Sequence, residues 1–202
     1  PKGVQAYVQL ILNDAERVVD RWAGLAASGE VVDMGEEMME LTASIILRAL
    51  FSTAADADIV RLKGHVETMI GYTTRRMGPH LPDWLPTPSQ RAYEHARDEV
   101  RGYIAGLIAE RRASGTTPND LLTRLMDARD DDGAPMSESL LRDESITMFF
   151  AGHETTARTM AAAWAALAAN PRVAARLHAE LDGVLGDRMP TVEDLRSLPY
   201  SL

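Results

Sequence analysis

The chain of 202 residues is 46% hydrophobic and 25% charged, which excludes a disordered chain and is typical of a globular protein with one or two domains. Its net charge is −9, from 21 basic and 30 acidic residues, and this acidic excess argues against a nucleic-acid-binding surface. The absence of cysteine excludes disulfides, thiol catalysis and thiolate metal ligands within these residues. Nearly every segment has apolar residues at helical spacing, so the sequence predicts an all-α fold.

The first three predicted helices follow one another closely. Apolar residues at helical spacing run from Val4 to Ala27 and stop before Gly29. Asp33 is predicted to cap a second helix that reaches Phe51, and a third helix is predicted from Asp58 to Arg75.

A loop and two further helices are predicted in the middle of the chain. Prolines recur between residues 77 and 89, which predicts a loop. Thr87 and Pro88 are then expected to begin a long helix that ends at Gly115, because proline suits the first helical turn. Asn119 is predicted to cap a short helix through Ala128.

The longest predicted helix begins after Ser137 and runs to about Ala169. Its middle is apolar on all sides, which predicts burial in the centre of a domain. Its longest uncharged run is shorter than the ~20 residues of a membrane-spanning helix.

Two shorter helices are predicted after it. The pair 170–171, Asn-Pro, begins a helix that closes at Gly186. Thr191 and Asp194 have the spacing of a capping box for a last short helix.

The sequence Ala-Gly-His-Glu-Thr-Thr, residues 151–156, interrupts the longest helix with polar groups. Ala151, Gly152, Thr155 and Thr159 are expected to line one stripe of the helix, and their small size allows a flat group or another backbone to approach. An acid next to a hydroxyl, as in Glu154 and Thr155, can form a proton relay.

Three interpretations of this segment compete. A zinc hydrolase motif His-Glu-x-x-His would need a second histidine at position 157, which is alanine. A packing defect would use the small residues for helix contact and pair Glu154 with Arg158. The third interpretation is the floor of a pocket for a planar cofactor, with the acid and the alcohol beside it.

The segment 151–156 resembles the (Ala/Gly)-Gly-x-(Asp/Glu)-Thr-(Thr/Ser) signature of bacterial-type cytochrome P-450 haem-thiolate monooxygenases. Other segments resemble the family in the same order along the chain: 28–52, 81–88, the Asn-Pro pair at 170–171 and Leu-Pro-Tyr at 198–200. The axial cysteine of the family is absent. Glu94 to Arg97 and Glu193 to Arg196 match its Glu-x-x-Arg pattern, but at the wrong places, and are interpreted as surface helix pairs.

The resemblance implies that residues 1–202 are an internal part of a single haem domain, incomplete at both ends. It implies a long central helix over about 137–169 and a region over about 58–89 that is similar to the mobile access lid of the family. The fragment alone is expected to be inactive, since no residue here can replace the cysteine ligand.

The resemblance also implies roles for individual residues. Glu154 and Thr155 would be catalytic and relay protons to oxygen on the haem. The residues implied to contact the haem are Ala151, Gly152 and Thr156, and those implied to line the substrate pocket are Met148, Phe149 and Phe150. His153 occupies a variable position of the signature.

The implied reaction inserts one atom of dioxygen into a hydrophobic small-molecule substrate. Haem is the implied cofactor, and the electrons would come from a partner of the ferredoxin or flavoprotein reductase type. A cytoplasmic location in a bacterium is expected, with a membrane anchor before residue 1 left open. The alternative is a stand-alone helical module that binds other proteins and has no catalytic activity.

Overall fold

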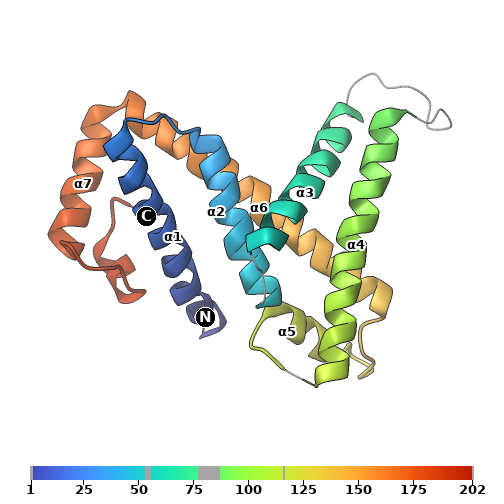
Figure 1. Ribbon diagram of the computed structural model, residues 1–202. Helices are drawn as coiled ribbons and strands as arrows, with labels where there is room; N and C mark the ends of the chain where they lie inside the picture. Colours follow the sequence, from blue (N-terminus) through green and yellow to red (C-terminus); the bar gives the residue numbers. More distant parts are fainter. Residues whose placement is uncertain (1, 53–55, 77–86, 116, 202) are drawn as a thin grey trace. The chain divides into compact units, whose positions relative to one another are not determined.

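A computed structural model describes residues 2–52, 56–76, 87–115 and 117–201 (Figure 1). These residues form seven α-helices and one 3-10 helix. Within the same ranges there is no β-strand, only an isolated bridge between Arg129 and Pro135. The prediction of an all-α fold is therefore confirmed.

The helices follow the predicted order closely. Their bounds are α1 Lys2–Ser28, α2 Met34–Phe51, α3 Asp56–Arg76, α4 Pro88–Ser114, α5 Leu121–Asp127, α6 Glu138–Ala169, α7 Pro171–Leu185 and the 3-10 helix η1 Glu193–Ser197. Most of the loop predicted over residues 77–89, and with it part of the lid-like region, lies outside the described residues. None of the described helices has the length and apolar character that a membrane crossing requires.

Several helix ends form at the predicted residues because local side chains satisfy the free backbone groups. Asp33 Oδ1 accepts hydrogen bonds from the backbone N–H groups of Gly35, at 2.7 Å, and Glu36, at 3.2 Å. Thr87 Oγ1 accepts from Gln90 N at 3.1 Å, directly before Pro88. Helix α4 ends at Gly115, whose φ of 64° is in the left-handed region that glycine adopts without strain.

The predicted cap of α5 is wrong by one residue. Asp120, not Asn119, is the N-cap, and its Oδ1 accepts from Thr123 N at 2.8 Å. Asn119 Oδ1 instead accepts a hydrogen bond from Arg124 at 3.1 Å. Asp120 takes this position because the charged side chain of Arg111 also contacts the same oxygen, at 2.7 Å.

The capping box predicted near the C-terminus forms only in part. Asp194 Oδ2 accepts from Thr191 N at 2.7 Å, as the motif requires. Thr191 Oγ1, however, donates to the same carboxylate at 2.8 Å instead of accepting from a backbone N–H. The helix that follows is the short 3-10 helix η1.

The chain divides into two compact units, Pro1–Ile45 with Glu154–Leu202, and Ile46–His153. The first unit contains a core cluster of Met38, Leu41 and Ala157, with α1 side chains such as Trp22 packed against it. Trp22 also donates to Glu37 Oε2 at 2.6 Å. Ser44 Oγ also donates to Asp14 Oδ2 at 3.0 Å, so apolar contacts and several polar contacts together hold α1 to α2.

The C-terminal end of the first unit is held by α7. Glu180 accepts hydrogen bonds from Tyr200 N at 2.7 Å, Ser201 N at 2.9 Å and Ser201 Oγ at 2.6 Å. Desolvation opposes the charged form, but these hydrogen bonds from Ser201 and Tyr200 lower the pKa of Glu180. The Arg176 guanidinium lies 4.1 Å from the centroid of the Tyr200 ring.

The second unit is built around the antiparallel pair α3 and α4, which lie side by side (Figure 1). Its buried apolar side chains recur at helical spacing, which is the pattern that the sequence displays. They include Leu62, Val66 and Met69 on α3 and Ala96, Val100, Ile104 and Ile108 on α4. The Arg111 side chain, near the end of α4, is also inside this unit and is only 7% exposed.

The longest predicted helix is confirmed as α6, and Ser137 Oγ accepts from Leu140 N at 3.2 Å at its start. The prediction that its middle is buried on all sides is wrong within the described residues. Thr155, Thr156 and Thr159 are exposed, and Trp164 is 42% exposed. The apolar composition of the helix therefore does not imply burial, although the Trp164 ring still packs edge-on against Trp22 of α1, with ring centroids 5.8 Å apart.

Candidate functional site

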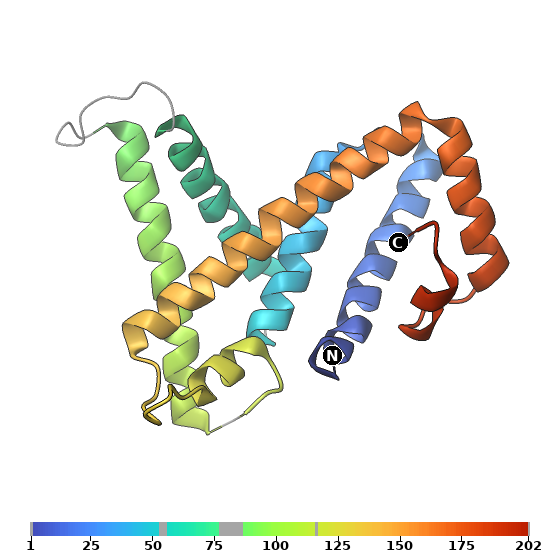
Figure 2. The same cartoon turned by 180° about the vertical axis from the view of Figure 1, so that it is seen from behind.

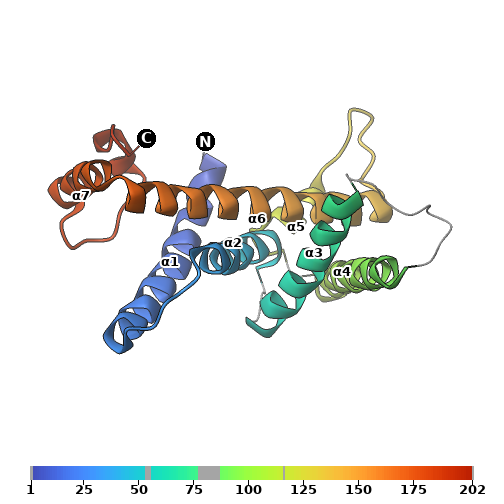
Figure 3. The ribbon, with the colours of Figure 1, turned by 90° about the horizontal axis from the view of Figure 1, so that it is seen from above.

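The candidate site lies on α6, which continues without a break through residues 151–156 (Figures 2 and 3). Gly152 does not interrupt the helix. A threonine does bond back to a carbonyl one turn earlier, as expected for a polar helix interior. Thr159 is an example, since its Oγ1 donates to Thr155 O at 2.8 Å.

Glu154 is held by Arg158, one turn later on the same helix. Arg158 Nε and Nη2 lie 2.7 Å and 2.6 Å from Glu154 Oε1. The Glu154 side chain is 23% exposed and that of Arg158 is 72% exposed. The structure therefore contains the ion pair that the packing interpretation expects, at a position open to solvent.

Three small side chains lie on one stripe of α6, at spacings of four residues. Ala151, Thr155 and Thr159 are all exposed. Such spacing places side chains one above another along the helix. The stripe therefore presents a shallow surface of methyl and hydroxyl groups, with Thr155 at its middle.

The prediction that Gly152 belongs to this stripe is wrong, because Gly152 packs against α2. A Cβ atom at this position would lie 3.0 Å from Ile46 Cδ1 and 3.4 Å from Ile46 Cγ1. The close approach of Ile46 is thus one physical reason for glycine here. The predicted contact of Gly152 with haem stays a prediction.

We predict that Gly152→Ala destabilises the protein by about 1 kcal/mol, measured by urea unfolding. Alanine gains ~1 kcal/mol in helix propensity over glycine. The contact with Ile46 costs more, since overpacking usually costs ~1–3 kcal/mol. The Ile46→Val background removes Cδ1, so Gly152→Ala should be neutral or stabilising there. Equal effects in both backgrounds would contradict this explanation.

The residues before the relay pair pack inside the second unit. His153 is fully buried, and its ring stacks on Phe149 with centroids 5.5 Å apart and an interplanar angle of 7°. Phe149 is 2% exposed, whereas Met148 and Phe150 are half-buried. The packing role of His153 was not predicted, although its spacing of four from Phe149 could have indicated it.

Two pockets lie within the units, and neither is lined by the predicted site residues. One, of about 370 Å³, is bordered in the first unit by α2 and α6, and Arg158 is among its lining residues. The other, of about 420 Å³, is bordered by α3 and α4. Of the predicted site residues, Ala151, Thr155 and Thr156 are exposed, whereas Gly152 and Glu154 are half-buried.

Comparison with known proteins identifies the family. The family model for cytochrome P450 matches residues 1–201. The chain is 34% identical to the Cyclooctat-9-en-7-ol 5-monooxygenase of Streptomyces melanosporofaciens, over 98% of this chain and 43% of that protein. It is 31% identical to the Pentalenene oxygenase of Streptomyces avermitilis, over 89% of this chain and 40% of that protein.

A solved structure shows the same fold. The crystal structure of the cytochrome P450DA heme domain superposes with a TM-score of 0.84 at 26% identity, over 96% of this chain and 43% of that one. The chain thus belongs to the cytochrome P450 family, and it spans less than half the length of these relatives. Haem is the cofactor of this family.

Proposed function

We propose that the full-length protein containing this chain is a haem-dependent monooxygenase in which Glu154 and Thr155 deliver protons to the reaction. The observation that carries the proposal is the acid and alcohol side by side in the sequence of α6, on a helix whose neighbouring small residues are exposed. The family match over residues 1–201 supports the same assignment.

The residues of α6 fit one face of a haem. A flat ring needs short side chains beneath it, and Ala151, Thr155 and Thr159 form such a surface. This chain has no cysteine, so a thiolate ligand to the iron has to come from outside these residues. When bound, a haem with a thiolate ligand supplies the electron density that favours O–O bond cleavage. The 202 residues alone are accordingly proposed to be inactive.

Glu154 is suited to exchange protons with solvent. Its side chain is partly exposed, and the Arg158 side chain that forms an ion pair with it is largely exposed to solvent. Exposure keeps the carboxylate in contact with water, from which it can take a proton. The Thr155 hydroxyl can both accept and donate hydrogen bonds, and can therefore pass a proton onward.

The substrate is proposed to be a hydrophobic organic molecule. Two relatives are named for oxygenation of cyclooctat-9-en-7-ol and pentalenene, and the residues implied to line the substrate pocket here, Met148, Phe149 and Phe150, are apolar. Electrons are proposed to come from a ferredoxin or a flavoprotein reductase. The proposed location is the cytoplasm.

The reaction class is tested with isotopically labelled dioxygen and the full-length protein. Turnover of a hydrophobic test substrate, with a reductase and ferredoxin supplied, should place one labelled oxygen atom in the product. The second atom should appear in water. Product oxygen that derives from solvent would exclude monooxygenation.

The Glu154→Gln variant distinguishes a role of Glu154 in proton transfer from a role in helix packing alone. We predict at least a tenfold loss of product formation, since general acid–base steps contribute ~10²–10⁴ and water can replace part of the relay. The change in stability should be below ~0.5 kcal/mol, which is typical of an exposed i,i+4 ion pair. Turnover and urea unfolding of the same preparation measure both quantities.

Arg158→Gln is the matched control for Glu154→Gln. It breaks the same ion pair but leaves the carboxylate, so it should keep most of the activity. Equal activity losses in the two variants would show that the ion pair matters and that the carboxylate does not relay protons.

A further inference from the structure

Two of the five histidines of this chain face each other across the helix pair α3 and α4. The ring centroids of His65, on α3, and His95, on α4, are 5.9 Å apart, and the ring planes meet at 86°. His65 is half-buried and His95 is exposed, so a solvent ion can reach the pair. Neither ring takes part in the proposed oxygenation site on α6.

We propose that His65 and His95 form a binding site for a divalent late transition metal ion such as Zn²⁺, Cu²⁺ or Ni²⁺. Neutral imidazole is the common protein ligand for these ions. The described residues contain no group of three or more His, Asp or Glu side chains placed to hold a metal. The site therefore supplies two nitrogen ligands, and water completes the coordination shell.

The ring geometry is close to what coordination requires. With Zn–N bonds of ~2.0–2.1 Å and tetrahedral angles, the centroids of two bound imidazoles lie roughly 5 Å apart. The rings have to approach each other by roughly 1 Å, which rotation about the side-chain bonds of the exposed His95 can supply. The nearly perpendicular ring planes are compatible with two ligands of one ion.

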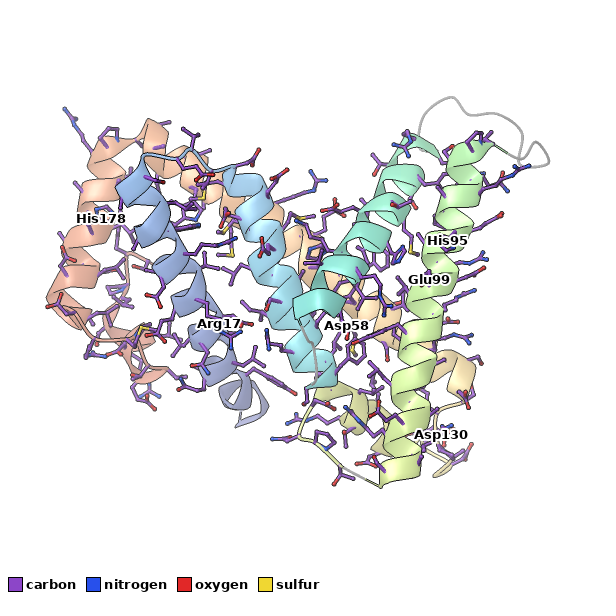
Figure 4. The ribbon with its side chains drawn as sticks, viewed as in Figure 1. Arg17, Asp58, His95, Glu99, Asp130 and His178 are labelled. Atoms are coloured by element: carbon purple, nitrogen blue, oxygen red, sulfur yellow. The ribbon has the colours of Figure 1, made fainter. Side chains whose placement is uncertain are left out.

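Charges of both signs lie near the pair. Arg61 and Arg91 precede His65 and His95 by one turn, and the Arg61 guanidinium is paired with Asp58 at 3.4 Å. Glu99 follows His95 by one turn of α4 (Figure 4), where its carboxylate adds negative charge near the imidazole. On α3, the Lys63 ammonium lies 3.8 Å from Glu67 Oε1, so its charge is offset locally. Hard cations such as Mg²⁺ and Ca²⁺ prefer oxygen ligands, and two imidazoles therefore select against them.

A bound ion would connect α3 to α4. Most of α3 belongs to the segment whose sequence resembles the access lid of the family, residues 58–89, and α4 begins where that segment ends. Metal binding should therefore reduce local opening of the two helices, because opening would break a metal–nitrogen bond.

The test uses the full-length protein with haem bound and Zn²⁺ as the probe, with affinity measured by competition against a chromophoric chelator. His65→Gln and His95→Gln should each weaken Zn²⁺ binding at least tenfold, since even residues that only support metal ligands contribute 10–100-fold. His178→Gln, at an exposed position on α7 (Figure 4), is the matched control and should leave the affinity unchanged. Wild-type affinity in either of the first two variants, or an equal loss in the control, would overturn the proposal.

A second measurement needs no variant. Zn²⁺ should slow amide hydrogen exchange in α3 and α4 of the wild-type protein and leave α7 unaffected. An exchange pattern in α3 and α4 that Zn²⁺ does not change would also overturn the proposal, even if both variants fail to fold.

Discussion

Thr155→Ala in the full-length protein is expected to reduce product formation by ~10²–10⁴ while electrons continue to be consumed. Alanine lacks the hydroxyl and the γ-methyl group of threonine. It therefore leaves room for water but has no group that can pass on a proton. Without the hydroxyl, proton delivery is no longer tied to oxidation of the substrate. The electrons then reduce dioxygen to hydrogen peroxide or water, and no product forms. Because Thr155 is exposed in this structure, the folded state should lose little stability.

The measurement is the amount of product formed per reduced cofactor consumed. Thr155→Ser is the matched control, since serine keeps the hydroxyl and should retain most of the coupling between electrons and product. If Thr155→Ala formed as much product per reduced cofactor as the wild type, Thr155 would not be part of the proton relay. The position of Thr155 in the family signature would then need another explanation.

The fold was predictable where local chemistry decides the structure. Asp33 and Thr87 cap helices because their side-chain oxygens reach backbone N–H groups within the next three residues. Gly115 ends α4 because a left-handed residue is needed there. Such features depend on a few neighbouring residues, and the sequence contains all of them.

The errors arise where distant residues decide. Asn119 and Asp120 are both good caps, and the contact with Arg111, nine residues from Asp120, favours the latter. The exposed part of α6 was predicted to be buried because its composition is apolar. Composition cannot show which elements cover a helix, and here Thr155 and Thr159 lie open within the described residues.

The sequence named the residues of the candidate site, whose catalytic role stays a prediction, but it did not show their surroundings. The signature indicated Glu154 and Thr155 as the relay pair, and the i,i+4 spacing indicated the Arg158 contact, which forms. The contact of Gly152 with Ile46 and the stacking of His153 on Phe149 could be recognised only in the three-dimensional structure. One helix thus uses different faces for packing and for the proposed chemistry.

Arg111→Met is expected to destabilise the protein by ~3–5 kcal/mol, because it leaves the carboxylate of Asp120 buried without its countercharge. Arg111 donates to Asp120 Oδ1 at 2.7 Å, to Thr123 Oγ1 at 3.1 Å and to Phe51 O at 3.0 Å. It therefore connects α4 to the end of α2 and the start of α5. Asp120 is 1% exposed, and its Oδ2 has no hydrogen-bond partner among the described residues, so Arg111 carries most of the compensation.

The matched control is Arg112→Met, one residue further along α4. Arg112 also makes an ion pair, with Glu138 at 2.9 Å, but the two side chains are 49% and 62% exposed. Exposed pairs contribute ~0–1 kcal/mol, so this variant should shift the urea midpoint little. Domains of this kind have unfolding free energies of ~5–15 kcal/mol, and the loss at Arg111 would therefore remove a large share of the total. Equal shifts in the two variants would show that burial does not govern the strength of the Arg111 network.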